Sequence, residues 1–304
     1  MSKKKILIFL VIVCFIIYSR ESEMKFEKIK YIERKTGEIK TEKVMGEGAL
    51  KFLSDWYGRK MSKPESKEKI KSFVEEMGID MSEYKRPIED YTSFNDFFYR
   101  ELKDGARKID YNENVVVSAA DGKILAFENI KEVDTFFVKG SEFTLEEFFN
   151  DKELAKKYEN GIFVIIRLAP ADYHRFHFPV DGEISEVKKI SGDYYSVSTH
   201  AIKTNFRIFC ENKREYAILK TKKFGDIAMF DIGATMVGGI VQTYKANSFV
   251  KKGEEKGYFL FGGSTCILVF EKDKVIIDKD IIENTQNKLE TKIYMGEKFG
   301  NEKN

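Results

Sequence analysis

The feature that most constrains the fold is a series of short apolar runs that begins after Asp110. The runs are rich in β-branched residues and are divided by Gly, Asp and Asn: 115–117, 123–127, 162–168, 182–190, 217–219, 226–232 and 264–270. Short strands joined by glycine-bearing turns, without regular alternation of strand and helix, favour antiparallel pairing. The sequence therefore predicts an α+β protein whose body, residues 111–304, is mainly antiparallel β and sandwich-like or barrel-like.

Residues 24–110 are predicted to form a helical lead-in to this body. Ser62-Lys63-Pro64-Glu65 has the spacing of a capping box, and Gly78 supplies a stop. Between them, four apolar residues recur at the spacing of one helix face: Ile70, Phe73, Val74 and Met77. Ser93 is expected to cap a second helix, and Thr144-x-x-Glu147 is a capping box for a helix within the body.

Residues 1–23 are predicted to be a hydrophobic, membrane-associating segment. Three lysines precede an apolar run, 6–18, which as a helix spans about 20 Å, short of a hydrocarbon core of about 30 Å. A signal peptide fits the basic start, but no small-x-small cleavage pattern follows. An inner-leaflet anchor and a natural start at Met24 stay open. We expect membrane association on the cytoplasmic side, either peripheral or through this N-terminal anchor.

Composition and spacing argue against several classes of function. The 52 basic and 50 acidic residues nearly cancel, and no basic domain with interleaved aromatics occurs, so nucleic-acid binding is not predicted. Cys14, Cys210 and Cys266 form no Cys-x-x-Cys pair, and His174-x-x-His177 lacks further ligands, so no metal is expected. No Rossmann or P-loop glycine pattern supports nucleotide chemistry.

Three loops punctuated by glycine or proline hold the candidate chemistry. Ser264 follows two glycines and opens an apolar run, which is typical of a tight turn feeding a buried strand, although Gly-Gly-Ser alone is also an ordinary hairpin turn. Asp121 lies beside Gly122. Of the three histidines in the chain, His174 and His177 share one loop, whereas His200 has no motif around it and is read as structural. An Asp, a His and a Ser are the parts of an oriented nucleophile.

Taken together, these stretches resemble the phosphatidylserine decarboxylase family. The resemblance rests on Tyr173-His174-Arg175-Phe176-His177-Phe178-Pro179 and Phe261-Gly262-Gly263-Ser264-Thr265, and it covers most of the chain beyond about Met24. Further stretches that resemble the family follow the same order: 94–102, 138–140, 195–197, 211–214 and 233–238. The Gly-Gly-Ser-Thr form is one of two variants that the family uses at this site.

The resemblance implies a proenzyme that cuts itself between Gly263 and Ser264 into chains 1–263 and 264–304, which stay associated. Asp121 would orient His177, His177 would take the Ser264 proton, and Ser264 would attack the Gly263 carbonyl. Ser264 would then become a covalent pyruvoyl group, which forms a Schiff base with phosphatidylserine and replaces pyridoxal phosphate as the electron sink. Carbon dioxide leaves, and His174 is expected to return a proton to give phosphatidylethanolamine.

Two alternatives of different class stay open. A serine hydrolase or protease could use the same Asp121, His177 and Ser264, but Ser264 would then survive intact. A non-catalytic, membrane-tethered β module would show neither cleavage nor an effect of replacing Ser264. The expected partner is phosphatidylserine within membrane lipid, and assembly into a homo-oligomer is left open.

Overall fold

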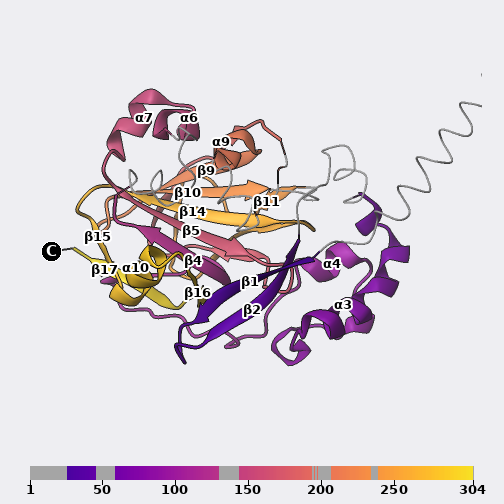
Figure 1. Cartoon of the computed structure of the whole chain (residues 1–304). Helices are drawn as coiled ribbons and strands as arrows, with labels where there is room; N and C mark the ends of the chain where they lie inside the picture. The colour runs from indigo at the N-terminus through magenta and orange to yellow at the C-terminus, as the bar shows by residue number, and fades with distance from the viewer. Residues whose placement is uncertain are drawn as a thin grey trace, which may run out of the picture.

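The computed structural model describes residues 26–45, 59–129, 144–193, 195, 197, 207–233 and 239–303 (Figure 1). The predictions made for residues 1–23, 138–140, 234–238 and His200 lie outside these described residues. Within the described part of the chain, no helix is both long enough and apolar enough to cross a membrane.

The described strands build one large sheet that runs through the middle of the body. Eleven of them form it, in the order β12-β7-β9-β10-β14-β5-β4-β16-β1-β2 with β8 beside β9. Their pairing is antiparallel except between β1 and β16, which run parallel. The strands are β1 (Phe26–Glu33), β2 (Ile39–Met45), β4 (Gly122–Phe127), β5 (Ile162–Leu168), β7 (Gly182–Ile184), β8 (Lys188–Ile190), β9 (Arg214–Lys220), β10 (Asp226–Gly233), β12 (Ser248–Val250), β14 (Ser264–Phe270) and β16 (Glu290–Ile293).

Two small antiparallel sheets accompany the large one. The first has the order β11-β13-β6, and the second has the order β15-β17-β3. Their strands are β3 (Val115–Val117), β6 (Arg175–His177), β11 (Ile240–Gln242), β13 (Glu255–Phe259), β15 (Val275–Ile277) and β17 (Lys298–Glu302). The predicted α+β class with a mainly antiparallel body is therefore confirmed.

The central strands of the large sheet are buried on both faces because two separate layers cover them. Along β5, Val164, Ile166 and Leu168 enter one apolar cluster, while Phe163 and Ile165 enter the other, as the two-residue period of a strand requires. The first cluster includes residues of the small sheets and of α10 (Lys279–Gln286). The second is covered by α6 (Leu145–Phe149), α7 (Lys152–Lys157) and α9 (Ile208–Glu211), seen above the sheet in Figure 1. Each large apolar side chain buried this way contributes about 1.5–3 kcal/mol.

Within the lead-in predicted over residues 24–110, the described residues after 58 contain helices, whereas the described residues before 46 do not. Residues 26–45 form the hairpin β1–β2, which adds to the end of the large sheet through β1 and β16. The helical elements follow: η1 (Pro64–Glu68), α3 (Lys69–Met77), η2 (Met81–Glu83), η3 (Ile88–Asp90) and α4 (Phe94–Phe98). The hairpin was missed because its Lys and Glu residues give it too little apolar character, and its place depends on a partner strand far along the chain.

The predicted helix ends compare well with the structure, with one exception. Gly78 ends α3 at φ +64°, Ser93 caps α4, and the Thr144 hydroxyl accepts from the Glu147 N–H. The capping box predicted at Ser62 is wrong, because the residue before η1 is Lys63, and its side chain makes no capping hydrogen bond. The Ser62 hydroxyl instead accepts a hydrogen bond from Asn95, which belongs to α4.

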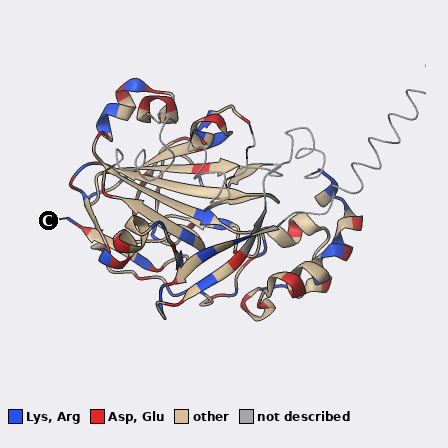
Figure 2. Ribbon diagram, in the orientation of Figure 1, with Lys and Arg blue, Asp and Glu red and all other residues tan. Residues whose placement is uncertain are grey.

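Charged residues concentrate on the helices and at the ends of the strands, and the middle of the large sheet is mostly uncharged (Figure 2). A few ionisable side chains on the sheet strands are nevertheless buried, among them Lys123, Arg167 and Asp231. Buried charges are tolerated only when they are paired, and several of these pairs lie around the candidate site.

Candidate active site

Ser264 is the first residue of β14 and lies at the centre of the large sheet. It pairs with Gly233 of β10 on one side and with Leu168 of β5 on the other. Its side chain is fully buried, and its hydroxyl has no hydrogen-bond partner among the described residues. Leaving a buried hydroxyl unpaired costs about 1–3 kcal/mol. The presence of a serine at position 264 is therefore not explained by a contribution to stability.

The peptide segment before Ser264 is held by the lead-in helix α4. The Asn95 side-chain oxygen accepts a 2.8 Å hydrogen bond from the Phe261 N–H. The Phe261 ring packs edge-on against Phe94 and Phe98, each with a ring-centroid separation of 5.0 Å. Gly262 has φ +147°, a conformation that glycine adopts far more readily than other residues. The predicted turn before the strand is thus anchored by a contact to a helix that lies far away in the sequence.

His174 lies in the loop between β5 and β6 and is completely buried. Its Nδ1 donates to the Asp172 carbonyl at 2.8 Å, so Nε2 is the unprotonated nitrogen of the neutral ring. In the described part of the chain, this Nε2 has no hydrogen-bond partner. Burial, followed by the positive charge of Arg100, lowers the pKa of His174 to about 3. The ring also lies against Phe98, 3.9 Å away between centroids, so one aromatic residue contacts both His174 and Phe261.

His177 is the last residue of β6 and has both ring nitrogens occupied. Its Nδ1 donates to the Gly253 carbonyl at 2.9 Å, and its Nε2 accepts from the Tyr173 hydroxyl at 3.0 Å. Burial lowers the pKa of His177, while the hydrogen bond to Gly253 and the carboxylates of Glu255 and Asp121 oppose that shift. His177 is therefore a neutral imidazole whose basic nitrogen is already engaged by a phenol.

Asp121 directly precedes β4 and binds an arginine. Its carboxylate accepts from the Arg107 guanidinium, with the shortest contact at 2.6 Å, and from the Met295 N–H at 2.8 Å. Arg107 also reaches Glu83 of the lead-in at 3.0 Å. Among the described residues, no hydrogen bond joins Asp121 to His177. The two are nevertheless close in the fold, because the His177 N–H donates to the Ala119 carbonyl, two residues from Asp121.

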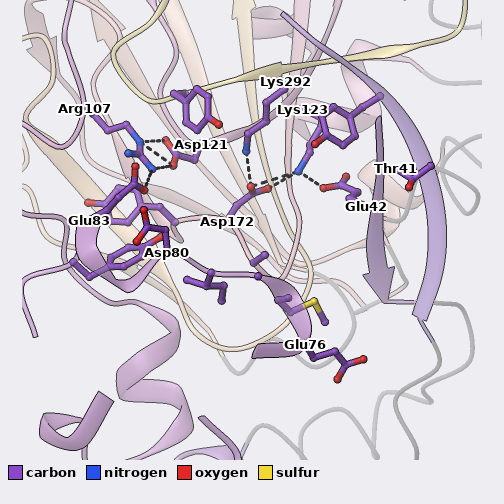
Figure 3. A pocket seen from close by; sticks show the side chains of 18 of the residues that line it. Thr41, Glu42, Glu76, Asp80, Glu83, Arg107, Asp121, Lys123, Asp172 and Lys292 are labelled. Atoms are coloured by element: carbon purple, nitrogen blue, oxygen red, sulfur yellow. Dashed lines mark hydrogen bonds and ion pairs between the residues drawn. The ribbon is translucent and has the colours of Figure 1, made fainter. Parts of the chain in front are cut away.

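A cavity of about 500 Å³ lies beside Asp121 and Arg107, and Asp172 also lines it (Figure 3). The Asp172 carboxylate accepts from Lys292 Nζ at 2.6 Å and from Lys123 Nζ at 3.1 Å, and Lys123 also pairs with Glu42. Burial alone would raise the pKa of Asp172, but the charges of Lys123 and Lys292 hold that pKa well below its usual range. The cavity wall is thus built from paired charges of both signs.

A second cavity, of about 340 Å³, opens next to His177. Tyr173 and Arg107 line both cavities, so they stand at the boundary between the Asp121 side and the His177 side. Among the described residues, no group of His, Cys, Asp and Glu side chains is arranged to hold a metal ion.

The four residues singled out in the sequence are all buried, but their contacts differ from those expected. The structure adds partners that sequence reasoning missed: Asn95, Arg100, Arg107 and Tyr173. Asn95, Arg100 and Tyr173 lie within stretches that carry the family resemblance, which could have drawn attention to them. Arg107 lies in no such stretch, and only the folded chain reveals its contact with Asp121.

Comparison with known proteins gives one consistent result. The family model described as phosphatidylserine decarboxylase matches residues 94–301. A protein of Fusobacterium nucleatum subsp. nucleatum named phosphatidylserine decarboxylase proenzyme is 86% identical over 92% of this chain and 100% of its own length. Proteins of the same name from Clostridium novyi and Clostridium tetani are 50% and 47% identical, over 82% and 90% of this chain and 85% and 98% of their own lengths.

Proposed function

The chain belongs to the phosphatidylserine decarboxylase family and converts phosphatidylserine to phosphatidylethanolamine and carbon dioxide, and we propose that it does so through a pyruvoyl group made from Ser264. The observation that carries this proposal is the buried Ser264 hydroxyl, which follows Gly263 and has no hydrogen-bond partner among the described residues. A hydroxyl kept free of hydrogen bonds next to a peptide bond suits a nucleophile that acts once on its own chain. The relatives' name, proenzyme, agrees with such a cut.

The proposed maturation reaction needs only the chain itself and water, without an external oxidant. The Ser264 oxygen attacks the Gly263 carbonyl carbon, and the peptide C–N bond breaks as an ester forms. Loss of the α-proton of residue 264 then expels the Gly263 carboxylate and leaves dehydroalanine. Water hydrolyses this group, ammonia departs, and a ketone remains at the new N-terminus of chain 264–304.

The residues around Ser264 fit such a group. Position 264 is buried at the head of β14, so a group formed there is held by the strand and shielded from bulk water. A pyruvoyl group supplies a ketone that bonds covalently to a primary amine and a carbonyl that accepts the electron pair left by carbon dioxide. The chain itself must supply the bases and acids that move protons at this point.

We assign the first proton transfer to His177 and the later one to His174. His177 is neutral with a basic Nε2, and the Asp121 carboxylate favours its protonated form. In the uncut chain this Nε2 is bound to Tyr173, so His177 must exchange that partner for the Ser264 hydroxyl. His174 keeps an unoccupied, unprotonated Nε2, which can take up a proton and return it to substrate carbon. General acid–base catalysis of this kind contributes roughly 10²–10⁴-fold.

One observation favours the exchanged assignment as a second candidate. The buried atoms that have no hydrogen-bond partner in the described structure include the His174 Nε2 and the Ser264 hydroxyl, whereas the His177 Nε2 is occupied. In that version His174 would be the base for the cut. Single replacements of the two histidines separate these candidates.

Intact mass measurement tests the pyruvoyl proposal. Freshly purified protein should separate under denaturing conditions into chains 1–263 and 264–304, the smaller with an N-terminus blocked to stepwise sequencing. Ser264→Ala should stay as one chain and release no carbon dioxide, whereas Ser264→Cys, which keeps a nucleophile, should still cut slowly. A wild-type chain that remains whole with an ordinary Ser264 would falsify the proposal.

We also propose that the chain works at a membrane surface, because its substrate is a bilayer lipid. Removing residues 1–23 should leave self-cleavage intact and should lower binding to phosphatidylserine vesicles only in part. Sedimentation with such vesicles measures the binding. A truncated chain that neither folds nor cuts would show instead that this segment belongs to the folded body.

A further inference from the structure

Arg100 lies two residues after the end of α4 and is completely buried. A buried arginine normally pairs with a carboxylate, yet the hydrogen-bond partners of Arg100 in the described structure are all neutral. Its Nη2 donates to the Ala171 carbonyl at 2.6 Å, to the Tyr84 hydroxyl at 3.1 Å and to the Asp172 carbonyl at 3.2 Å. Its Nη1 makes a weaker contact with the Phe98 carbonyl at 3.4 Å. The guanidinium is thus held against the backbone that leads into His174.

The Asp172 carbonyl connects Arg100 to His174. This one oxygen accepts both from Arg100 Nη2, at 3.2 Å, and from His174 Nδ1, at 2.8 Å. A carbonyl oxygen has two lone pairs and can only accept, so both contacts are satisfied, and the proton of the neutral His174 must be on Nδ1. Any movement of the Asp172 carbonyl would release this constraint on the ring.

We propose that Arg100 is a positioning residue for His174, fixing the 171–172 backbone so that the ring keeps its proton on Nδ1 and its Nε2 free for proton transfer. The value of this arrangement rests on the function proposed above, in which His174 moves a proton at Nε2. Because Phe98 of α4 also lies 3.9 Å from the His174 ring, the lead-in forms part of the catalytic site.

The charges near His174 favour its neutral form, as the hydrogen bond at Nδ1 does. Burial disfavours the imidazolium of His174, and the nearby cations Arg100 and Lys123 disfavour it further, while the Asp172 carboxylate opposes them. Removing the Arg100 side chain should therefore raise the pKa of His174. It should also allow the proton of the neutral ring to be on either Nδ1 or Nε2. Lysine at this position would retain the charge, but it would lack the planar set of N–H donors with which a guanidinium binds several acceptors at once.

Nitrogen NMR of the histidine rings tests the proposal without depending on catalysis. The chain has three histidines, so ¹⁵N-histidine labelling gives few signals, which single histidine replacements assign. In the mature wild-type enzyme at neutral pH, His174 should be neutral with its proton on Nδ1. In Arg100→Met it should show a mixture of the two tautomers and protonate at higher pH, and in Arg100→Lys it should show the mixture with a smaller change in pKa.

Tyr84→Phe is the matched control, because it removes one hydroxyl partner of Arg100 but leaves the guanidinium. His174 should then keep its Nδ1 proton, and the His177 signals should stay unchanged in every Arg100 variant. The mature Arg100→Lys enzyme should lose roughly 10²-fold in kcat, the scale of a misplaced catalytic group, with little change in KM.

Two results overturn the proposal. The first is a wild-type His174 that carries its proton on Nε2 or is charged at neutral pH, a measurement that needs no variant to fold. The second is a folded Arg100→Met or Arg100→Lys protein whose His174 signals match the wild type. If the tautomer responds as expected but His174→Ala decarboxylates at the wild-type rate, the role of His174 in catalysis fails while the positioning by Arg100 stands.

Discussion

Ser264 pairs with Leu168 across β14 and β5, so the Gly263–Ser264 bond enters the large sheet near its middle. The strand that begins at this bond lies between β10 and β5, and both neighbours belong to chain 1–263. Cleavage there divides the sequence but leaves every strand pairing of β14 available. The cut is thus placed where it can create a new chain end without opening the fold.

The two chains should therefore remain associated after the cut. Chain 264–304 supplies β14 to the sheet between β10 and β5, and β16 between β4 and β1, so the small chain is inserted between strands of the large chain at two places. We expect the processed protein to elute as one species from a sizing column and to separate only in denaturant. Release of the small chain in native buffer would contradict this interleaved arrangement.

Replacing the two motif histidines should give different defects. His177→Ala and Asp121→Ala should accumulate the uncut chain, because the proposed base for Ser264 is lost or left unsupported. His174→Ala should cut normally but decarboxylate roughly 10²–10⁴-fold more slowly. A denaturing gel follows the cut, and carbon dioxide release from phosphatidylserine follows turnover.

The opposite pattern would exchange the two roles. If His174→Ala stays uncut while His177→Ala is processed, the free Nε2 of His174 is the base for maturation. If both variants cut and turn over at wild-type rates, both histidines are structural, and the mechanism built on them is wrong.

Arg107→Met should destabilise the chain strongly, because it leaves the Asp121 carboxylate buried with only the Met295 N–H as a hydrogen-bond partner among the described residues. Breaking a buried ion pair by removing one member costs about 3–5 kcal/mol. Urea unfolding of Arg107→Met in the uncut Ser264→Ala background measures the free energy of unfolding. The control is Glu83→Gln at the more exposed end of the same network, which should cost less than about 1 kcal/mol. Equal losses in the two variants would show that the Asp121 pair is not the important one.

Acid should destabilise the uncut chain through His174. Its pKa is about 3 in the folded chain and about 6.5 when unfolded, so the unfolded state binds the proton more tightly. This contribution to stability is complete above pH of about 6.5 and is lost as pH falls toward about 3, by up to roughly 5 kcal/mol.

Unfolding in urea at several pH values, in the Ser264→Ala background, measures this dependence. His174→Asn keeps a side-chain N–H near the Asp172 carbonyl but cannot titrate, so its stability should fall less between pH 6.5 and pH 4. His177 shifts in the same direction, so some acid sensitivity should remain. An identical pH profile for His174→Asn would mean that His174 is not held neutral by the fold.

The local features of this protein were determined by the sequence alone. Apolar runs such as 162–168 and 264–270 coincide with β5 and β14, because a strand buried on both faces needs nearly every side chain to be apolar. Ser93 and Thr144 cap helices because a side-chain oxygen beside free N–H groups acts within one turn of chain. The motif residues His174, His177 and Ser264 were identified in the same way, from short stretches.

Only the tertiary structure decided which groups meet. Periodicity indicates that a side chain is buried but does not identify its partner. From the sequence, Asp121 was expected to orient His177. In the fold, Asp121 instead binds Arg107, and His177 is hydrogen-bonded to Tyr173 and Gly253. The tautomer of His174 likewise depends on the Asp172 carbonyl that Arg100 holds. These contacts join segments brought together by the order of strands in the sheets and by the packing of α4, which no local pattern encodes.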